Sequence, residues 1–230
     1  DKFLNIAKNV KILVIGDLII DKYVLCEPLG KSGKGTFLTF KRGRENKFVG
    51  GSGFIANQLA NFSNKVSLIS VIGDSPKDEQ YIRKNCNKNI NMKLIKGLNS
   101  ITIQKTRFVE KVDLNKIVGI YDIDKSEIHK SIEKKIIKYL LKNKKKYDLI
   151  LISDFGHGII TQPIINILGK MKGIKAVNSQ VNSSNKDRNR LNNFKNVDIA
   201  TLNSSELSYD LGKDSDDKNT IQLTKQFMLI

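Results

Sequence analysis

An alternation of strand-like and helical runs is the feature that most constrains how this 230-residue chain folds. The segment 148–153 is apolar through its centre, as is expected of a strand buried on both faces of a sheet. In the segment 126–143, Ile residues from Ile128 onward and then Leu140 recur every four positions and form an apolar helical stripe. This alternation predicts an α/β sandwich with a mainly parallel sheet.

The expected elements run along the whole chain, with two interruptions. We expect strands at residues 11–16, 66–72, 148–153, 174–178 and 197–202. We expect helices at residues 53–63, 77–88, 126–143, 161–172 and 216–228. The interruptions, residues 22–49 and 100–122, contain β-prone pieces but no good helical pattern. They predict a small β-sheet lid that projects from the main domain and covers a site.

The net charge of +17 raises the question of a nucleic-acid partner. Lys supplies 34 of the 40 basic residues, and Lys, Ile and Asn all have A/T-rich codons, so genome bias accounts for the basicity. Arg, which dominates base readout and bidentate phosphate contacts, occurs only six times. The composition therefore argues against nucleic-acid binding.

The cysteine content and the hydropathy are typical of a cytoplasmic protein. Cys26 and Cys86 are too few for a disulfide framework, and we expect both to be free thiols. No apolar run reaches the roughly 18 residues that span a bilayer, and no signal-peptide pattern opens the sequence. We therefore expect a cytoplasmic localisation and no membrane partner.

Polar residues gather where the expected strands end. The first strand leads into Asp17, with Asp21 four residues later, and two such carboxylates accept hydrogen bonds from several hydroxyls at once. A glycine pair, Gly50 and Gly51, lets a ligand approach bare backbone before a helix, and Asn57 offers a donor and an acceptor. Later strands end at Asp154, Asn178 and Asn203. Because open α/β sheets bind ligands at the carboxyl ends of their strands, this edge predicts a cleft suited to a polyol such as a sugar.

Two glycine-rich segments are similar to nucleotide-binding motifs. Residues 30–36 look like a P-loop, but Gly35 is followed by Thr36 where the motif needs Lys, so we expect a flexible lid loop. Residues 51–56 fit the dinucleotide fingerprint G-x-G-x-x-A, with Asp74 after the next strand. The strand before this second segment is short and charged, so an NAD(P)-binding oxidoreductase is kept as the alternative function.

These motifs, in their order and spacing, resemble those of the PfkB (ribokinase-like) carbohydrate kinases from about residue 10 to the C-terminus. The matching segments are G-D-x-x-x-D at 16–21, the glycine pair with its Asn at 50–57, V-I-G-D at 71–74, K-T-R at 105–107, S-D-F-G-H-G at 153–158 and N-x-x-E at 203–206. The segments at 105–107 and 153–158 favour the heptose-phosphate kinases, which feed nucleotide-activated heptose synthesis, as the nearest subgroup. The resemblance implies a Rossmann-like three-layer α/β/α sandwich with a small β-sheet lid.

The resemblance also implies roles for individual residues. Arg107 would meet an anionic group on the substrate, and Glu206 would hold Mg²⁺ through water. The other substrate-binding positions that it implies are Asp17, Asp21, Gly50, Gly51, Asn57, Lys105 and Asp154. The positions that it implies near ATP are Asn178, Asn203 and Glu206. The expected ligands are therefore a sugar or sugar phosphate, such as a heptose 7-phosphate, together with ATP and Mg²⁺.

The chain departs from the family's pattern at three places. The glycine segment has two more residues before Asn57 than heptose kinases usually have, and Asn178 stands where that subgroup generally has Asp. The family's G-A-G-D segment, whose Asp activates the attacking hydroxyl, is absent from a chain that begins with Asp and ends at Ile230. We therefore expect residues 1–230 to be an incomplete PfkB-type kinase domain, inactive alone. A non-catalytic sugar- or nucleotide-binding module is the other alternative.

The lid is also the expected surface for self-association. Phe37, Phe40 and Phe108 give it aromatic area that solvent would otherwise meet, and an isolated small sheet with an exposed edge is marginally stable. A symmetric contact between two lids would bury this area and form a homodimer. Alternatively, the rings fold down onto the ligand cleft.

Overall fold

A six-stranded parallel sheet forms the centre of the computed structural model, which describes residues 2–97, 100–124, 127–180, 191–194 and 196–211. Its strands are β1 (Lys11–Gly16), β4 (Lys65–Ile72), β5 (Asn91–Lys96), β8 (Leu149–Asp154), β9 (Ile174–Ser179) and β10 (Ile199–Thr201). They lie in the order β10-β9-β8-β1-β4-β5, and each pairs in parallel with its neighbours. Parallel strands place all their carboxyl ends at one edge, so the loops that follow them meet there.

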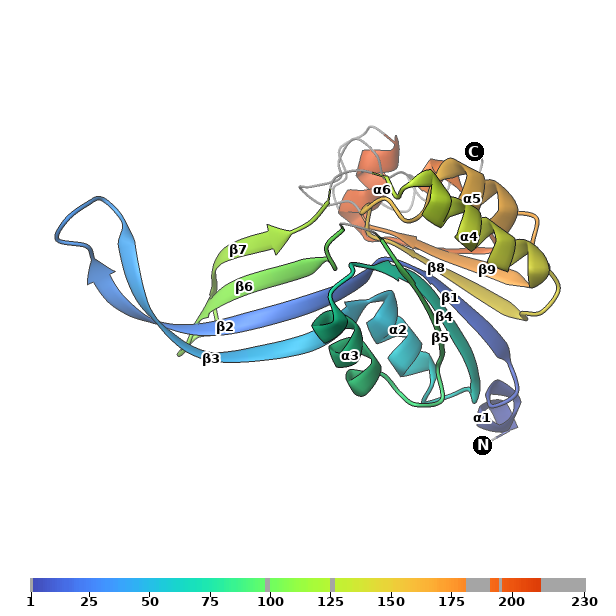
Figure 1. The fold of residues 1–230 in the computed structure, drawn as a ribbon, viewed down its shortest axis with the longest axis horizontal. Coiled ribbons are helices and arrows are strands. Elements are labelled where there is room, and N and C mark those ends of the chain that lie inside the picture. The colour runs from blue at the N-terminus through green and yellow to red at the C-terminus, as the bar shows by residue number, and fades with distance from the viewer. Residues whose placement is uncertain (1, 98–99, 125–126, 181–190, 195, 212–230) are drawn as a thin grey trace.

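Helices cover both faces of this sheet (Figure 1). One face carries α2 (Ser52–Leu59) and α3 (Pro76–Asn85), and the other carries α4 (Lys130–Lys142) and α5 (Gln162–Leu168). Two hydrophobic clusters follow from this layering, because successive side chains of a strand point to opposite faces. In β1, Leu13 packs in the cluster that contains Ile136 of α4, while Val14 packs in the cluster that contains Ile82 of α3.

Three short helical elements lie outside this sandwich core. They are α1 (Lys2–Ala7), the 3₁₀ helix η1 (Leu191–Asn193) and α6 (Ser204–Leu211), which follows β10. Among the residues that the structure describes, no helix has the length and apolar character that crossing a membrane requires.

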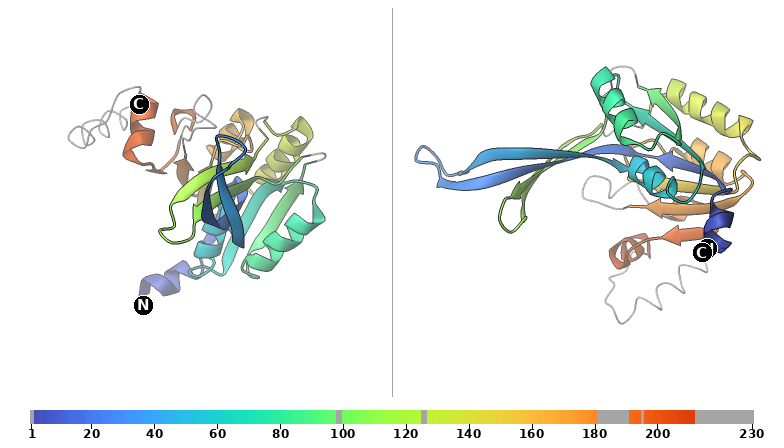
Figure 2. Two further views of the ribbon diagram at one scale, coloured as in Figure 1. Left: turned by 90° about the vertical axis from the view of Figure 1, so that its left-hand side faces the viewer. Right: turned by 90° about the horizontal axis from the view of Figure 1, so that it is seen from below.

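A second, four-stranded sheet forms a lid over the carboxyl edge of the central sheet. Its strands are β2 (Leu18–Lys31), β3 (Leu38–Gly51), β6 (Gln104–Glu110) and β7 (Lys116–Asp122), in the order β3-β2-β6-β7. The strands β2 and β3 pair antiparallel from Leu18 and Gly51 to Lys31 and Leu38, and they form a long hairpin. This hairpin projects far from the main domain, as Figures 1 and 2 show. β6 pairs in parallel with β2 and antiparallel with β7.

The α/β architecture and the lid predicted from the sequence are confirmed, although element boundaries differ by a few residues. The helix expected at 126–143 begins only at Lys130, because the ring nitrogen Nδ1 of His129 accepts a hydrogen bond from the Ser131 backbone and caps it. The segment 30–36, expected as a lid loop, lies at the tip of the β2–β3 hairpin. The helix expected at 216–228 lies outside the described residues.

Four elements were missed, namely α1, β5, η1 and α6, and the sequences of β5 and α6 carry weak periodic signals. β5 reads N-M-K-L-I-K, and as the outermost strand of the sheet it exposes Lys93 and Lys96, so the apolar run is broken. α6 reads S-S-E-L-S-Y-D-L and has little apolar content. A capping interaction at its start, described below, defines its first turn.

Candidate functional site

Asp17 is the residue around which the candidate site is built. It follows β1, and its side chain is 0% exposed. Its Oδ2 accepts hydrogen bonds from the backbone N–H groups of Phe155 at 2.8 Å and His157 at 3.3 Å. Its own backbone N–H donates to the Ser153 carbonyl at 3.1 Å, and its carbonyl accepts from the Ser52 N–H at 2.9 Å. Asp17 therefore joins the loop after β1, the loop after β8 and the start of α2.

Several buried polar atoms at this edge have no hydrogen-bond partner among the described residues. The second oxygen of Asp17, Oδ1, is one of them, and the others at this edge are Ser153 Oγ, Ser179 Oγ and His157 Nε2. These residues end or follow β1, β8 and β9, which are neighbours in the sheet. Because buried polar groups in folded proteins are nearly always paired, the set indicates a place for a polar ligand or for ordered water.

Burial shifts the ionisation of the charged groups at this site. It raises the pKa of Asp17 to about 6, although the amide hydrogen bonds and the charge of Lys105 act in the opposite direction. Burial likewise lowers the pKa of Lys105, which is 8% exposed on β6, and the carboxylates of Asp21 and Asp17 oppose that shift. The amino group of Lys105 lies 5.7 Å from the ring centroid of Tyr121 and 5.9 Å from that of Phe155. The charges of Lys105 and Asp17 therefore oppose each other where both side chains are buried.

The glycine pair is required because the end of β3 passes very close to Asp17 and Asp21. A Cβ on Gly50 would lie 2.1 Å from Oδ2 of Asp21, and a Cβ on Gly51 would lie 2.2 Å from the carbonyl oxygen of Asp17. Gly51 also has a φ of 57°, a left-handed conformation that side chains rarely adopt. The glycines thus let the lid strand β3 turn directly into α2, beside both carboxylates.

The register of the lid places the charged residues on one face. Asp21 on β2 pairs with Lys105 on β6, and Tyr23 pairs with Arg107 two residues further along. On the other side of β6, Lys105 pairs with Tyr121 of β7, while Arg107 faces a glycine. Because residues two apart on a strand share a face, these side chains form a continuous polar and aromatic surface.

Arg107 is already paired within the chain. It forms an ion pair with Asp21, and its guanidinium carbon lies 5.4 Å from the Tyr23 ring centroid and 5.8 Å from the Tyr121 ring centroid. The side chains of Arg107 and Asp21 are only 20% and 23% exposed. The role of Arg107 as a contact for a substrate anion stays a prediction, and any such anion would meet an arginine that Asp21 already holds.

A cavity of about 560 Å³ lies between the lid and the helices α2 and α3, and we call it the lid cavity. Four of the predicted substrate-binding residues line it, namely Asp21, Gly50, Gly51 and Asn57, together with Tyr23 and Phe155. Its volume falls in the range of small-molecule sites. Asp17 is not among its lining residues, because Phe155 and the loop that Asp17 holds lie between them.

Asn57 lines the lid cavity but also joins two helices. Its Nδ2 donates to the Asn85 carbonyl at 3.2 Å, and its Oδ1 accepts from the Asn87 N–H at 2.7 Å. Both polar atoms of the side chain are therefore in use at the C-terminal end of α3. In the first turn of α2, Phe54 faces the cavity and is 54% exposed, so an apolar ring lies beside the glycine pair.

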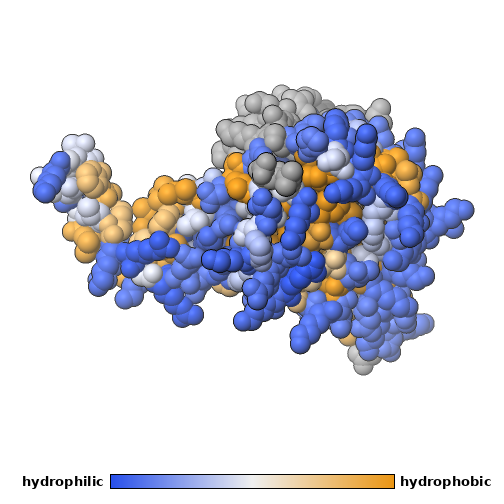
Figure 3. All heavy atoms as spheres, in the orientation of Figure 1, coloured by the Kyte–Doolittle hydropathy of each residue, from blue (hydrophilic) through white to orange (hydrophobic). Residues whose placement is uncertain are grey.

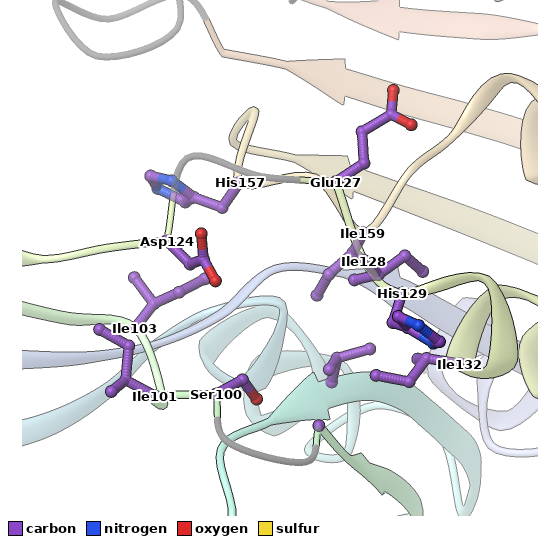
Figure 4. Close-up of a pocket in the computed structure, with 12 residues that line it drawn as sticks. Ser100, Ile101, Ile103, Asp124, Glu127, Ile128, His129, Ile132, His157 and Ile159 are labelled. Carbon is purple, nitrogen blue, oxygen red and sulfur yellow. The ribbon is translucent and has the colours of Figure 1, made fainter.

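A second cavity, of about 360 Å³, lies on the other side of the loop after β8. Figure 4 shows isoleucine side chains around it and the carboxylate of Glu127 turned away from it. His157 and Ser100 line it, and each has a buried polar atom without a partner among the described residues. Burial lowers the pKa of His157 to about 4, and the nearby Lys105 charge acts in the same direction. His157 is therefore neutral at pH 7.

The residues predicted to lie near ATP follow β9 and β10. Asn178 donates from Nδ2 to the Thr201 carbonyl at 2.8 Å, which ties the ends of these strands together. Asn203 and Glu206 form a capping box at the start of α6, in which each side chain accepts from the other's backbone N–H at 2.8 Å. This box uses one carboxylate oxygen of Glu206. The oxygen-rich donor set suits a hydrated Mg²⁺, which prefers oxygen ligands.

Asp154, the remaining predicted site residue, ends β8 and is 4% exposed. Its Oδ1 accepts from the Gly156 N–H at 2.9 Å, so it shapes the same loop that Asp17 holds. Among the described residues, no group of three or more His, Cys, Asp or Glu side chains is arranged to hold a metal ion.

Sequence reasoning missed the three aromatic residues that contact the cations, Tyr23, Tyr121 and Phe155. A signal exists for one of them, because Tyr23 lies two residues after Asp21 and therefore shares its face of a strand. The pairing of Lys105 with Tyr121 depends on the register between β6 and β7, which no local pattern reports. Phe155 lies in a loop, where the sequence predicts no direction for a side chain.

The dinucleotide fingerprint at 51–56 lies in a different context from the one it requires. The fingerprint needs its glycines directly after a central parallel strand. Here the segment follows β3, an antiparallel strand of the lid, whereas the central strand β1 leads into Asp17. This placement weakens the oxidoreductase alternative.

Comparisons with known proteins agree with the resemblance expected from the motifs. Over 227 residues the chain is 31% identical to the "Bifunctional protein HldE" of Aliarcobacter butzleri, covering 94% of this chain and 44% of the relative. It is 29% identical to the protein of the same name from Campylobacter curvus, covering 96% of this chain and 46% of the relative. The chain thus spans less than half the length of these curated relatives. No family model matches the chain.

Solved structures show the same fold at low sequence identity. The ribokinase of Arabidopsis thaliana, solved with ribose and ATP, matches with a TM-score of 0.60 at 15% identity, covering 95% of this chain and 68% of that one. Phosphofructokinase-2 of Escherichia coli, solved with substrates and products, matches with a TM-score of 0.68 at 12% identity, covering 93% and 66%. The chain therefore has the PfkB (ribokinase-like) carbohydrate kinase fold, as its motifs predicted.

The raised pKa of Asp17 predicts how stability depends on pH. Its ordinary value is near 4, so between about pH 4 and 6 the folded state keeps a proton that the unfolded state releases. The contribution of Asp17 to stability therefore falls as pH rises through this window. In an Asp17→Asn variant, which cannot ionise, this loss is absent.

We expect the wild type to lose on the order of 1–3 kcal/mol relative to Asp17→Asn between pH 4 and pH 7. Urea unfolding of both proteins at several pH values measures the difference, which is independent of any constant cost of the substitution. A difference that stays flat, or that grows in favour of the wild type, would show that Asp17 ionises normally.

Proposed function

We propose that this chain binds the sugar in an ATP-dependent carbohydrate kinase, which phosphorylates a hydroxyl of a sugar or sugar phosphate. The observation that carries the proposal is the set of buried polar atoms at the carboxyl edge, Oδ1 of Asp17 among them, that have no partner among the described residues. A polyol is the ligand class that offers several hydroxyls to one edge. The ribokinase-like fold and the HldE relatives support the same reading.

In this proposal the residues of the chain recognise the sugar by hydrogen bonds to buried charges. Hydroxyls donate to the carboxylates of Asp17 and Asp21, and hydrogen bonds to charged groups are stronger than neutral ones. The bare backbone of Gly50 and Gly51 lets the sugar ring approach closely. Because Asp17 lies beneath Phe155, the ligand has to displace this ring or the loop that carries it.

The cationic face of the lid suits a sugar that carries an anionic group. Lys105 and Arg107 place two positive charges on one face, stacked between aromatic rings and largely shielded from water. Arg presents a fork that matches phosphate oxygens, and Lys contributes a point charge. Together with the HldE relatives, this supports a sugar phosphate, and a heptose 7-phosphate in particular, as the substrate.

ATP and Mg²⁺ would bind at the ends of β9 and β10. Asn178, Asn203 and Glu206 supply amide and carboxylate oxygens there, and Glu206 would hold Mg²⁺ through water. The bound ion would neutralise charge on the phosphates during transfer. The residue that activates the sugar hydroxyl is not assigned, because the 230 residues contain no G-A-G-D segment.

The unpaired buried atoms at the carboxyl edge require only that a polar ligand binds, so a sugar- or nucleotide-binding module without kinase activity is a second candidate function. Both candidates predict sugar binding at Asp17. They differ in turnover, because only a kinase converts ATP to ADP in the presence of the sugar.

The first test is a calorimetric titration of the chain with ATP, NADH and a panel of sugars that includes ribose, fructose 6-phosphate and a heptose 7-phosphate. We expect binding of ATP in preference to NADH, and binding of at least one sugar. Asp17→Ala should weaken sugar binding roughly tenfold to a hundredfold and leave ATP binding unchanged. A preference for NADH would favour the oxidoreductase, and unchanged sugar affinity would make Asp17 a structural residue only.

A second prediction concerns the ion pair between Asp21 and Arg107. If the arginine receives the anionic group of the sugar, Asp21 competes with that group for it. Asp21→Asn should therefore strengthen binding of the phosphorylated sugar severalfold relative to its unphosphorylated form. Arg107→Lys should weaken it, because an ammonium cannot replace the bidentate fork. Weaker phosphosugar binding by Asp21→Asn would show instead that Asp21 holds the arginine in its binding position.

The lid is also proposed to pair with a second copy of itself. At the hairpin tip, Phe37 and Leu38 are 59% and 62% exposed, an apolar surface that a symmetric contact would cover. Light scattering should give a dimeric mass at micromolar concentration, reduced toward the monomer by Phe37→Ser. Phe62→Ser is the matched control, because Phe62 is 52% exposed beyond α2. A monomeric wild type would exclude the dimer.

A further inference from the structure

A groove of about 750 Å³ lies at the outer edge of the central sheet, between β5 and α4, far from the residues assigned to sugar binding. Five lysines line it, and we call it the lysine groove: Lys93 and Lys96 of β5 with Lys135, Lys138 and Lys142 of α4. Its other lining residues include Ile95 and Tyr139, which pack in the cluster on the α4 face of the sheet, and Leu94, which packs in the cluster on the α3 face. Figure 3 shows hydrophilic side chains gathered over α4 on this face of the molecule.

The high lysine content of the chain does not account for this groove. Lys makes up 34 of the 230 residues, yet it supplies five of the nine residues that line the groove, roughly four times its share. No Asp or Glu is among the lining residues. If the groove only reflected the composition of the chain, acidic residues would line it as well as lysines.

The charges in the groove are largely uncompensated. Lys96 pairs with Glu79 of α3 at 2.7 Å, but the other four lysines have no carboxylate within 4 Å among the described residues. The one acid of α4, Glu133, is buried on another side of the helix, where it accepts from Thr161 Oγ1 at 2.6 Å. It is therefore turned away from the groove.

The helix lysines also have like-charge neighbours. Lys138 lies three residues after Lys135 and four before Lys142, spacings at which like charges repel and destabilise a helix. Lysines on an edge strand are a common defence against unwanted strand pairing, and this explains Lys93 and Lys96. Protection against strand pairing does not explain the three lysines of α4, because a helix has no strand edge to protect.

The strand that forms one wall adds a second kind of recognition. Among the described residues, β5 is the last strand of the sheet and pairs only with β4, so one row of its backbone N–H and C=O groups faces no described strand. An extended peptide binds such an edge through main-chain hydrogen bonds, while its alternate side chains point to the two faces of the sheet. Side chains that point toward α4 would meet the lysines, and those that point to the other face would lie beside Leu94.

We propose that the lysine groove binds an extended acidic segment of a partner protein, in which carboxylates alternate with apolar residues, as an added strand on β5. Charge complementarity selects acids at the positions that point toward α4, and Leu94 on the opposite face of β5 favours apolar residues at the positions between them. A nucleic acid fits less well, because the groove holds no Arg and a single aromatic residue. That residue, Tyr139, has its hydroxyl bonded to Tyr147 at 2.6 Å.

The test is fluorescence anisotropy with a labelled decapeptide of alternating Glu and Val. The groove variant is Lys135→Glu with Lys138→Glu. The matched control is Lys77→Glu with Lys84→Glu on α3, two exposed lysines on a helix whose reversal changes the net charge equally. We expect the groove variant to bind the peptide at least about tenfold more weakly than the wild type, and the control variant to bind within about twofold. Hydrogen exchange should show protection of the β5 amides when the peptide binds.

Three outcomes would overturn the proposal. Equal losses in the groove and control variants would reduce the binding to diffuse attraction by a basic protein. Tighter binding of a ten-nucleotide oligodeoxythymidine, lost in the groove variant, would make the groove a nucleic-acid site. No measurable binding of the peptide, with both variants folded by thermal melting, would leave the lysines as a solvated face. The sugar-binding proposal is unaffected by any of them, because its residues lie elsewhere.

Discussion

The buried carboxylate of Asp17 is the contact on which the arrangement of the site depends. The carboxylate accepts hydrogen bonds from the loop after β8, and the backbone carbonyl of the same residue accepts one from Ser52 at the start of α2. All of these donors are backbone N–H groups, which do not vary with sequence, so the links constrain geometry while leaving the surrounding side chains free to change. Burial of the charge has a cost, seen in the raised pKa of Asp17, and its Oδ1 has no hydrogen-bond partner among the described residues.

Asp17 also marks the place where the lid joins the main domain. β2 begins one residue after Asp17, and β3 returns to end at the glycine pair, so the two long strands leave and re-enter the main domain at one place. Gly50 and Gly51 permit this because a Cβ at either position would meet Asp21 or Asp17. The carboxylates and the lid cavity are therefore one structural unit, and a change that moved the lid would move the carboxylates with it.

The sequence was sufficient for the architecture and for placing polar residues at the carboxyl edge of the sheet, but not for the contacts that these residues make. Buried strands such as β8 and the stripe of α4 carry strong periodic signals, and the ends of parallel strands meet by topology, so Asp17, Asp154 and Asn178 could be placed at one edge. The partners were not predictable in the same way. Asn57 bonds to the end of α3, and Arg107 meets Asp21, because of packing and register between segments far apart in the chain. β5 was missed because edge strands lack a continuous apolar run.

The charge balance around Asp17 bears on which ligands the site can accept. Lys105 lies near Asp17 and Asp21, and Arg107 pairs with Asp21, so two carboxylates stand against two cations and the group is neutral when all four are ionised. A neutral sugar can enter without changing this balance. A phosphorylated sugar adds negative charge to a site with little water, and the balance is restored only if a carboxylate moves away or takes up a proton. Burial raises the pKa of Asp17 to about 6, so Asp17 can take up a proton and let the site adjust to an anionic ligand.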